Sequence, residues 1–236
     1  MIEKIKVKFT ENRKNIIKIS SGTILGQAIS LITLPIIARI YGAEIIGLWA
    51  LLNSITFIIM AISDLGLTNA IMIEEEVYME RLYKVITTIV AFISIVSSVF
   101  VTIYFVHFSE TRINFVFLFN FIVFTFFATK QIQVCYTWLN RKGSYNILMK
   151  NPIIHNLIYG ISAIVLGIIG MKQYGYFLGH MIGQVATLVH MKHNLPKGMF
   201  STNISDFKTC INRNRRFIVY QMPTNLLVNF KSQLPV

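Results

Sequence analysis

The chain has 236 residues, of which 54% are hydrophobic and only 14% are charged, against roughly 25% charged residues in an ordinary soluble domain. So few charges argue against a soluble protein, and the apolar residues fall in long runs, as bilayer-spanning helices require. The net charge of +12 does not indicate nucleic-acid binding, because the Lys and Arg residues lie between the apolar runs rather than along one face of a domain.

In chain order, the apolar runs predict six membrane spans and the start of a seventh. Each run has about 19 to 26 residues, and roughly 20 residues cross the hydrocarbon core as a helix. The first run is too long for a signal peptide and lacks a cleavage motif. The sequence therefore predicts an all-α, polytopic transmembrane bundle. The predicted spans are 16–38, 45–63, 85–107, 113–138, 152–171 and 173–191, with the seventh starting near residue 217.

The basic residues predict the orientation of these spans. Seventeen of the 22 Lys and Arg residues lie in the N-terminal segment or follow the second, fourth and sixth spans. The other connections hold only Arg39, Arg112 and Lys172. Because cytoplasmic loops are enriched in Lys and Arg, we expect the N-terminus to be cytoplasmic.

A 200-residue offset relates the two ends of the chain. Asn12-Arg13 matches Asn212-Arg213, and Leu34-Pro35 matches Leu234-Pro235. Such pairing of the first and seventh segments is typical of two lobes built from a duplicated unit. We therefore expect one six-helix lobe, a basic cytoplasmic linker and the opening of a second lobe, so that the chain is truncated. The expected boundaries are 1–192, 193–216 and 217–236.

Several stretches, taken together and in order, resemble Wzx-type O-antigen flippases, which belong to the multidrug/oligosaccharidyl-lipid/polysaccharide exporter superfamily. The resemblance is sharpest over residues 20–71, and the end of the chain is similar to the start of that family's second lobe. The stretches are Ser20–Gln27, Leu34–Gly42, Gly47–Leu51, Asp64–Leu67, Asn69–Ile71, Tyr220–Pro223 and Gln233–Pro235.

The resemblance implies a transporter rather than an enzyme, with two lobes of helices around a central cavity that opens alternately to each side. It implies an undecaprenyl-diphosphate-linked oligosaccharide as cargo, for O-antigen, lipopolysaccharide or other polysaccharide biosynthesis in the bacterial inner membrane. It also implies membrane lipids, a polysaccharide polymerase and other assembly proteins as partners. No nucleic acid and no cofactor are expected.

Lys130 is the most informative single residue, because it lies inside the fourth predicted span. Ionisable groups at this depth usually face protein or water. Lys130 would then attract a diphosphate or an acidic sugar in a cavity, with Gln133 beside it. Alternatively, its stem reaches the cytoplasmic headgroups, since Trp138 and Arg141 mark that end of the span.

Three further polar residues are predicted to contact substrate. Gln27 belongs to a polar stripe on the first span, and Asn53 lies one turn from Thr56 on the second. By the resemblance, Arg39 lies near the outer mouth of the cavity. The alternatives are hydrogen bonding between helices for Gln27 and an interfacial anchor for Arg39.

Asp64 and His180 are the candidates for ion or proton coupling. Asp64 ends the second span, where it would pair with a cavity cation or a proton, or mark the membrane boundary. His180 lies in the sixth span and titrates near neutral pH if it is accessible, although a lone histidine in a packed helix is more often structural.

Regularly spaced glycines predict close helix packing. Gly22 and Gly26 form a G-x-x-x-G pair, and Gly175, Gly179 and Gly183 recur at every fourth position.

Motifs for nucleotide, metal or nucleophile chemistry are absent from the sequence. Cys135 and Cys210 have no metal-ligand spacing. Three alternatives to a flippase remain. The first is a multidrug exporter of the same superfamily, which would need acidic and aromatic cavity residues. The second is a membrane-embedded polymerase or acyltransferase, which would need a large outer loop, and the third is a non-transporting scaffold.

Overall fold

The computed structural model describes residues 2–108, 114–171 and 174–233, and over these residues it contains helices and no strand. The predicted all-α class is therefore confirmed. In chain order the elements are α1 (Ile2–Ile62), the 3₁₀ helix η1 (Leu67–Met72), α2 (Glu76–Phe108), α3 (Phe115–Arg141), α4 (Tyr145–Ile168), α5 (Gly175–Met191), the 3₁₀ helix η2 (Lys192–Asn194), α6 (Ile204–Arg213), the π-helix η3 (Phe217–Gln221) and α7 (Met222–Gln233).

Four helices in the described part of the chain are long and apolar enough to cross a membrane, by length and composition. They cover residues 13–62, 76–107, 115–141 and 145–168. The predicted sixth span coincides with α5, which has only 17 residues, so the total of six spans and part of a seventh stays a prediction. Arg112, Lys172 and the Leu234-Pro235 repeat lie outside the described residues.

Gly42 interrupts α1 between the first two predicted spans. A straight helix of 61 residues would be about 90 Å long, three times the thickness of the hydrocarbon core. Gly42 has a φ of 76° and a ψ of 170°, a non-helical conformation that glycine adopts without steric penalty. The predicted spans 16–38 and 45–63 therefore lie on two helical segments joined at this glycine, the second of which ends at Ile62, in agreement with the hydropathy pattern.

Contacts divide the chain into two compact units that alternate along the sequence. The first unit comprises residues 1–43 and 139–194, and the second comprises 44–138 and 195–236. The predicted division into a six-helix lobe at 1–192, a linker at 193–216 and the start of a second lobe at 217–236 stays a prediction.

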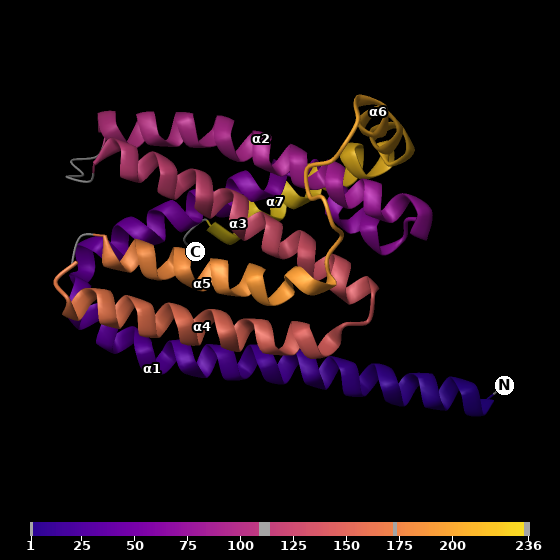
Figure 1. Ribbon diagram of the computed structural model, residues 1–236, viewed down its shortest axis with the longest axis horizontal. Coiled ribbons are helices and arrows are strands. Elements are labelled where there is room, and N and C mark those ends of the chain that lie inside the picture. Colours follow the sequence, from indigo (N-terminus) through magenta and orange to yellow (C-terminus); the bar gives the residue numbers. More distant parts are fainter. Residues whose placement is uncertain (1, 109–113, 172–173, 234–236) are drawn as a thin grey trace. The chain divides into compact units, whose positions relative to one another are not determined.

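In the first unit, α4 packs between the first part of α1 and α5. Gly22 lies against Met149, and further along Ile40 lies against Gly167, so α1 and α4 run in the same direction. Gly175, at the start of α5, faces Leu166, near the end of α4, so α5 runs antiparallel to α4. The two helices lie side by side in Figure 1. These directions are the ones expected when consecutive spans cross a bilayer alternately.

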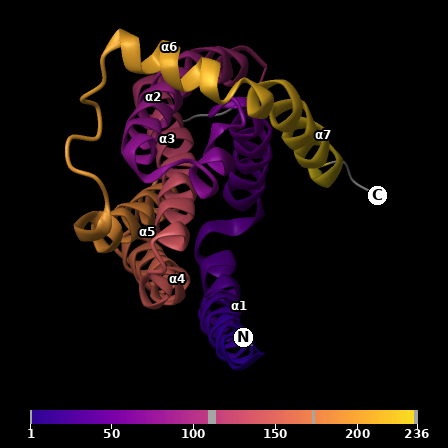
Figure 2. The same ribbon diagram turned by 90° about the vertical axis from the view of Figure 1, so that its right-hand side faces the viewer.

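In the second unit, α3 packs against both the second part of α1 and α2. The ring of Trp49 contacts Phe121 and Met60 contacts Lys130, so this part of α1 runs parallel to α3. The Tyr83 hydroxyl hydrogen-bonds with Cys135 on α3, in an antiparallel pair of helices. Figure 2 shows α6 lying across the start of α2 in this unit.

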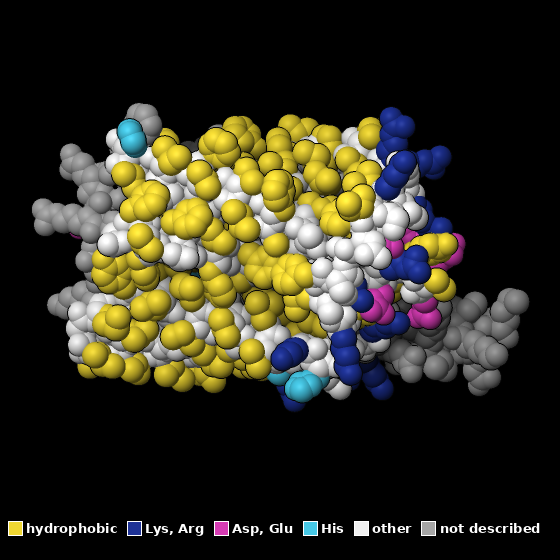
Figure 3. Space-filling model, turned by 45° about the horizontal axis from the view of Figure 1, so that its top comes forward, with side chains coloured by type: hydrophobic (Ala, Val, Ile, Leu, Met, Phe, Trp, Pro, Cys, Tyr) yellow, Lys and Arg dark blue, Asp and Glu magenta, His cyan; other side chains and the backbone are white. Residues whose placement is uncertain are grey.

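Exposed apolar side chains, such as Phe92 and Phe100, lie along α2. In Figure 3 hydrophobic side chains cover this helix, whereas Lys, Arg, Asp and Glu side chains gather around its start and around α6. This boundary between apolar and charged surface is what a helix needs where it leaves the bilayer.

Candidate functional site

The site in the second unit begins with the turn that follows α1. Leu65 and Gly66 have φ values of 54° and 75°. This turn lets the Asp64 carboxylate accept the backbone N–H groups of Gly66, at 3.2 Å, and Thr68, at 3.0 Å. Two features favour glycine at position 66. Its φ is positive, and a Cβ there would lie 2.9 Å from the backbone nitrogen of Met222. The turn therefore fixes the carboxylate at the start of η1.

Lys130 completes a buried ion pair with Asp64. Its Nζ lies 3.1 Å from the Asp64 Oδ1 and donates a hydrogen bond to the Met60 carbonyl oxygen at 3.0 Å. The side chains of Lys130 and Asp64 are only 4% and 1% exposed. A pair this deeply buried needs additional hydrogen bonds to offset its desolvation, and both members have them. Lys130 therefore does not extend along α3 to headgroups but points at the end of α1.

The charge pair lines a polar cavity of about 180 Å³. Amide and hydroxyl side chains supply most of the remaining polar groups. The Thr68 hydroxyl is buried and makes no hydrogen bond with any residue that the structure describes. The cavity thus offers a cation and several neutral donors and acceptors. Its lining residues are Phe57, Met60, Ala61, Asp64, Thr68, Asn69, Lys130, Gln133, Asn225 and Asn229.

The structure thus brings three of the predicted site residues together in one cavity: Asp64, Lys130 and Gln133. Asn53 lies on the same part of α1, partly exposed, and is not among the lining residues of this cavity. Arg39 belongs to the first unit, where it is exposed on α1.

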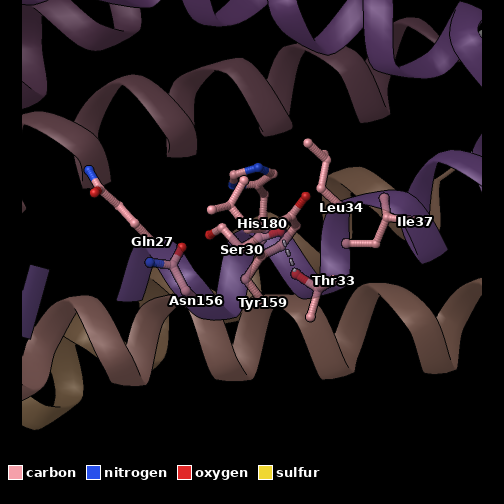
Figure 4. Close-up of a pocket in the computed structure, with 9 residues that line it drawn as sticks. Gln27, Ser30, Thr33, Leu34, Ile37, Asn156, Tyr159 and His180 are labelled. Atoms are coloured by element: carbon pink, nitrogen blue, oxygen red, sulfur yellow. Dashed lines mark hydrogen bonds between the residues drawn. The ribbon is translucent and has the colours of Figure 1, made fainter. Parts of the chain in front are cut away.

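A second cavity, of about 520 Å³, lies within the first unit. Figure 4 shows Gln27 and Asn156 at one end of it and Leu34 and Ile37 at the other, with His180 between them. Two predicted site residues, Gln27 and His180, therefore share this cavity. Its lining residues are Gln27, Ser30, Leu31, Thr33, Leu34, Ile37, Asn156, Tyr159 and His180.

His180 lies among aromatic side chains from α4 and α5. Its ring centroid is 4.1 Å from that of Tyr159 and 5.6 Å from that of Tyr176, and the His155 ring lies 6.1 Å away. These contacts fix the orientation of His180. The spacing of single residues along α5 does not reveal them, because two of the rings belong to α4.

All five predicted packing glycines lie where two helices approach closely. A Cβ on Gly22 or Gly26 would collide with backbone atoms of α4, at Met149 and Pro152. On α5, the three glycines face the side of α4, and a Cβ on Gly179 would lie 2.9 Å from backbone atoms of Ala163.

Asn225 and Asn229 are functional candidates that the sequence analysis did not single out. Both lie on α7 and line the charged cavity. Their spacing of four residues was the available signal, because it puts two amides on one face of a helix. The spacing alone does not show what the two amides contact, since nothing in the sequence indicates that α7 packs beside the turn after α1.

Among the described residues, no group of three or more His, Cys, Asp or Glu side chains could hold a metal ion. The polar groups of the cavity beside Asp64 are its charge pair, amides and hydroxyls.

Comparison with known proteins places the chain in a family. No curated protein and no solved structure matches it significantly. The family of polysaccharide biosynthesis proteins matches residues 13–234, which include both cavities and nearly the whole chain. The four long apolar helices agree with a membrane protein of this kind. The chain belongs to the family of polysaccharide biosynthesis proteins.

Proposed function

We propose that the chain acts in a flippase that moves an undecaprenyl-diphosphate-linked oligosaccharide repeat unit across the bacterial inner membrane by alternating access. The observation that carries the proposal is the buried Lys130–Asp64 pair, which lines a polar cavity with residues of α1 and α3, two helices apolar enough to cross a bilayer. The family supports a role in the transport of lipid-linked oligosaccharides rather than an enzymatic one. The proposed orientation has the N-terminus in the cytoplasm.

The physical task of such a protein is to replace the water that solvates sugar hydroxyls and phosphates. Burying these groups without partners costs several kcal/mol each, which blocks spontaneous crossing. The charged cavity supplies suitable partners: the amides of Gln133, Asn225 and Asn229 for hydroxyls, and the Lys130 ammonium for a phosphate oxygen. The lipid tail would stay in the bilayer, outside the cavity.

The ion pair suggests how Lys130 would be kept inside the bilayer without substrate. Asp64 neutralises the ammonium, and the Met60 carbonyl accepts one of its hydrogens. An approaching phosphate would compete with Asp64 for the ammonium. Binding of cargo and release of Asp64 would therefore be coupled, which gives the cavity two states of different charge.

Gln27, Asn53 and Arg39 remain proposed contacts for the sugar, and His180 and Asp64 remain proposed sites of ion coupling. His180 differs from Asp64 in its surroundings, because it lies among aromatic rings rather than beside a cation. A polysaccharide polymerase and other assembly proteins are the proposed partners.

The test is complementation of a bacterium that lacks its own flippase, supplied with the cognate sugar-lipid. Wild type is compared with Lys130→Met and with Lys130→Met/Asp64→Asn at matched membrane abundance. The double variant removes both charges, so no unpaired buried charge disturbs folding. Lys84→Met, which breaks the more exposed pair with Glu80, is the matched control.

We expect wild type and the control to restore surface polysaccharide and the double variant to reach normal abundance without restoring it. Restoration by the double variant would show that the pair is structural and that this cavity is not the substrate site. Failure of wild type would refute the flippase function itself.

A further inference from the structure

The junction between α6 and α7 carries a basic cavity that neither the charge pair nor the His180 cavity explains. It belongs to the second unit and has a volume of about 450 Å³. Three of its six lining residues are arginines. They are Arg213, Arg215 and Arg216, and the others are Asn212, Val219 and Tyr220.

Arg213 is already committed to protein partners. Its Nε donates to the Glu74 Oε1 at 2.7 Å, its Nη2 donates to the Glu75 Oε1 at 2.7 Å, and its guanidinium stacks over the Tyr78 ring. The hydrogen bonds to Glu75 and Glu74 raise the pKa of Arg213 above its ordinary value. The second Glu74 oxygen accepts a hydrogen bond from Asn214 at 2.9 Å. These contacts hold the end of α6 beside the start of α2.

Arg215 and Arg216 are different, because neither forms an ion pair with any residue in the described part of the chain. Both are exposed at the cavity. The nearby carboxylates of Glu74 and Glu75 are engaged by Arg213 and Asn214. Two adjacent guanidinium groups are thus left without a counter-charge. A planar guanidinium binds a phosphate with two parallel hydrogen bonds, which makes arginine the preferred residue for this ligand.

Two of the remaining lining residues, Val219 and Tyr220, are exposed and largely apolar. Val219 and Tyr220 follow Arg215 and Arg216 by four residues each, which is about one helical turn. Their side chains are 51% and 72% exposed. A row of charges followed by an exposed valine and tyrosine is typical of the boundary between headgroups and acyl chains, where tyrosine is enriched.

We propose that Arg215 and Arg216 form a binding site for the phosphate group of a membrane lipid, with Val219 and Tyr220 against the first part of its chain. Two lipids share this chemistry: an anionic phospholipid and a polyprenyl diphosphate. The proposal does not depend on flipping, because it concerns binding at the junction of α6 and α7.

The test measures binding to the purified full chain in detergent by calorimetry. The probes are short-chain phosphatidylglycerol, farnesyl diphosphate and, as a zwitterionic control, short-chain phosphatidylcholine. Wild type is compared with Arg215→Gln/Arg216→Gln and with Lys197→Gln/Lys208→Gln. The lysine variant loses the same charge from exposed positions between α5 and η3, outside the cavity lining. The thermal midpoint of each variant checks that it is folded. Substitutions at exposed positions change the stability little, so we expect midpoints close to that of wild type.

We expect the arginine variant to lose at least about tenfold in affinity for one or both anionic probes and the lysine variant to stay within about twofold of wild type. Loss for farnesyl diphosphate alone identifies a site for the diphosphate of a carrier lipid. Loss for phosphatidylglycerol alone identifies a site for bulk lipid, and loss for both establishes the shared phosphate chemistry. Equal losses in the two variants, or none, would overturn the proposal.

If the arginine variant fails to fold, Arg215→Lys/Arg216→Lys replaces it. This variant keeps both charges but loses the planar fork, so we expect weaker binding of at least one anionic probe at unchanged net charge. Unchanged affinity in this variant would likewise count against a built phosphate site.

Discussion

Replacing Lys130 by methionine isolates the energetic weight of the buried pair. The Asp64 carboxylate, 1% exposed, would keep its two backbone N–H donors and lose the ammonium. Removing one partner of a buried pair costs about 3–5 kcal/mol, because the remaining charge is uncompensated. For a chain of this length, one kcal/mol shifts the thermal midpoint by about 2–4 °C, so we expect a drop of roughly 6–20 °C.

The double variant Lys130→Met/Asp64→Asn tests the reason for that loss. The Gly66 and Thr68 N–H groups donate to different oxygens of Asp64, so the single amide oxygen of asparagine can accept one of these two hydrogen bonds, and no charge remains to be buried. We expect the free energy of unfolding of the double variant to return to within about 1 kcal/mol of the wild-type value. The two side chains would then have a coupling energy of at least about 2 kcal/mol.

Fluorescence-detected size-exclusion chromatography after heating measures the midpoints in detergent. Lys84→Met is the control, because its partner Glu80 is 53% exposed and such pairs contribute at most about 1 kcal/mol. If Lys130→Met is no less stable than this control, or if the double variant is as unstable as the single one, the argument from a coupled buried pair is wrong.

Three further predictions concern packing, reactivity and the α6 junction. Gly22→Ala should lower the thermal midpoint by several degrees, because its methyl group meets helix backbone, whereas Gly47→Ala, with open space around it, should leave the midpoint unchanged or raise it slightly. Burial and two neighbouring carboxylates raise the pKa of the Cys210 thiol, so maleimide labelling should be slow at pH 7 and accelerate on unfolding; rapid labelling of the folded chain would contradict this. Arg213→Gln should speed hydrogen exchange of the α6 backbone by releasing it from two carboxylates, whereas Lys208→Gln should not; equal exchange in both would show that the arginine does not hold α6.

Much of the helical structure is predictable from the hydropathy pattern, for a physical reason. In lipid a backbone must satisfy its own hydrogen bonds, so a long apolar run becomes a helix almost regardless of its side chains. The run 85–107 lies on α2 accordingly, and the run predicted at 113–138 lies on α3 from Phe115 onward. The separation at Gly42 follows from the same pattern, since a single helix would exceed the bilayer.

The site is predictable only in part. Lys130 attracts attention because a cation inside an apolar run is costly, and Asp64 because it ends one. Their pairing is not readable, since it depends on α3 running beside the second part of α1, a packing choice between distant segments. The position of Asn225 and Asn229 in the cavity is equally unpredictable, because two amides on one helix face do not reveal which segment that face packs against.

The alternation of the two units along the sequence has a consequence for biosynthesis. The first part of α1 packs against α4 and α5, so residues 44–138 must leave the ribosome before these contacts can form. Until then the face bearing Gly22 and Gly26, shaped for close helix approach, is open to any neighbouring helix in the membrane. Insertion factors that hold early helices apart would therefore matter more for this chain than for a bundle whose neighbours in space are also neighbours in sequence.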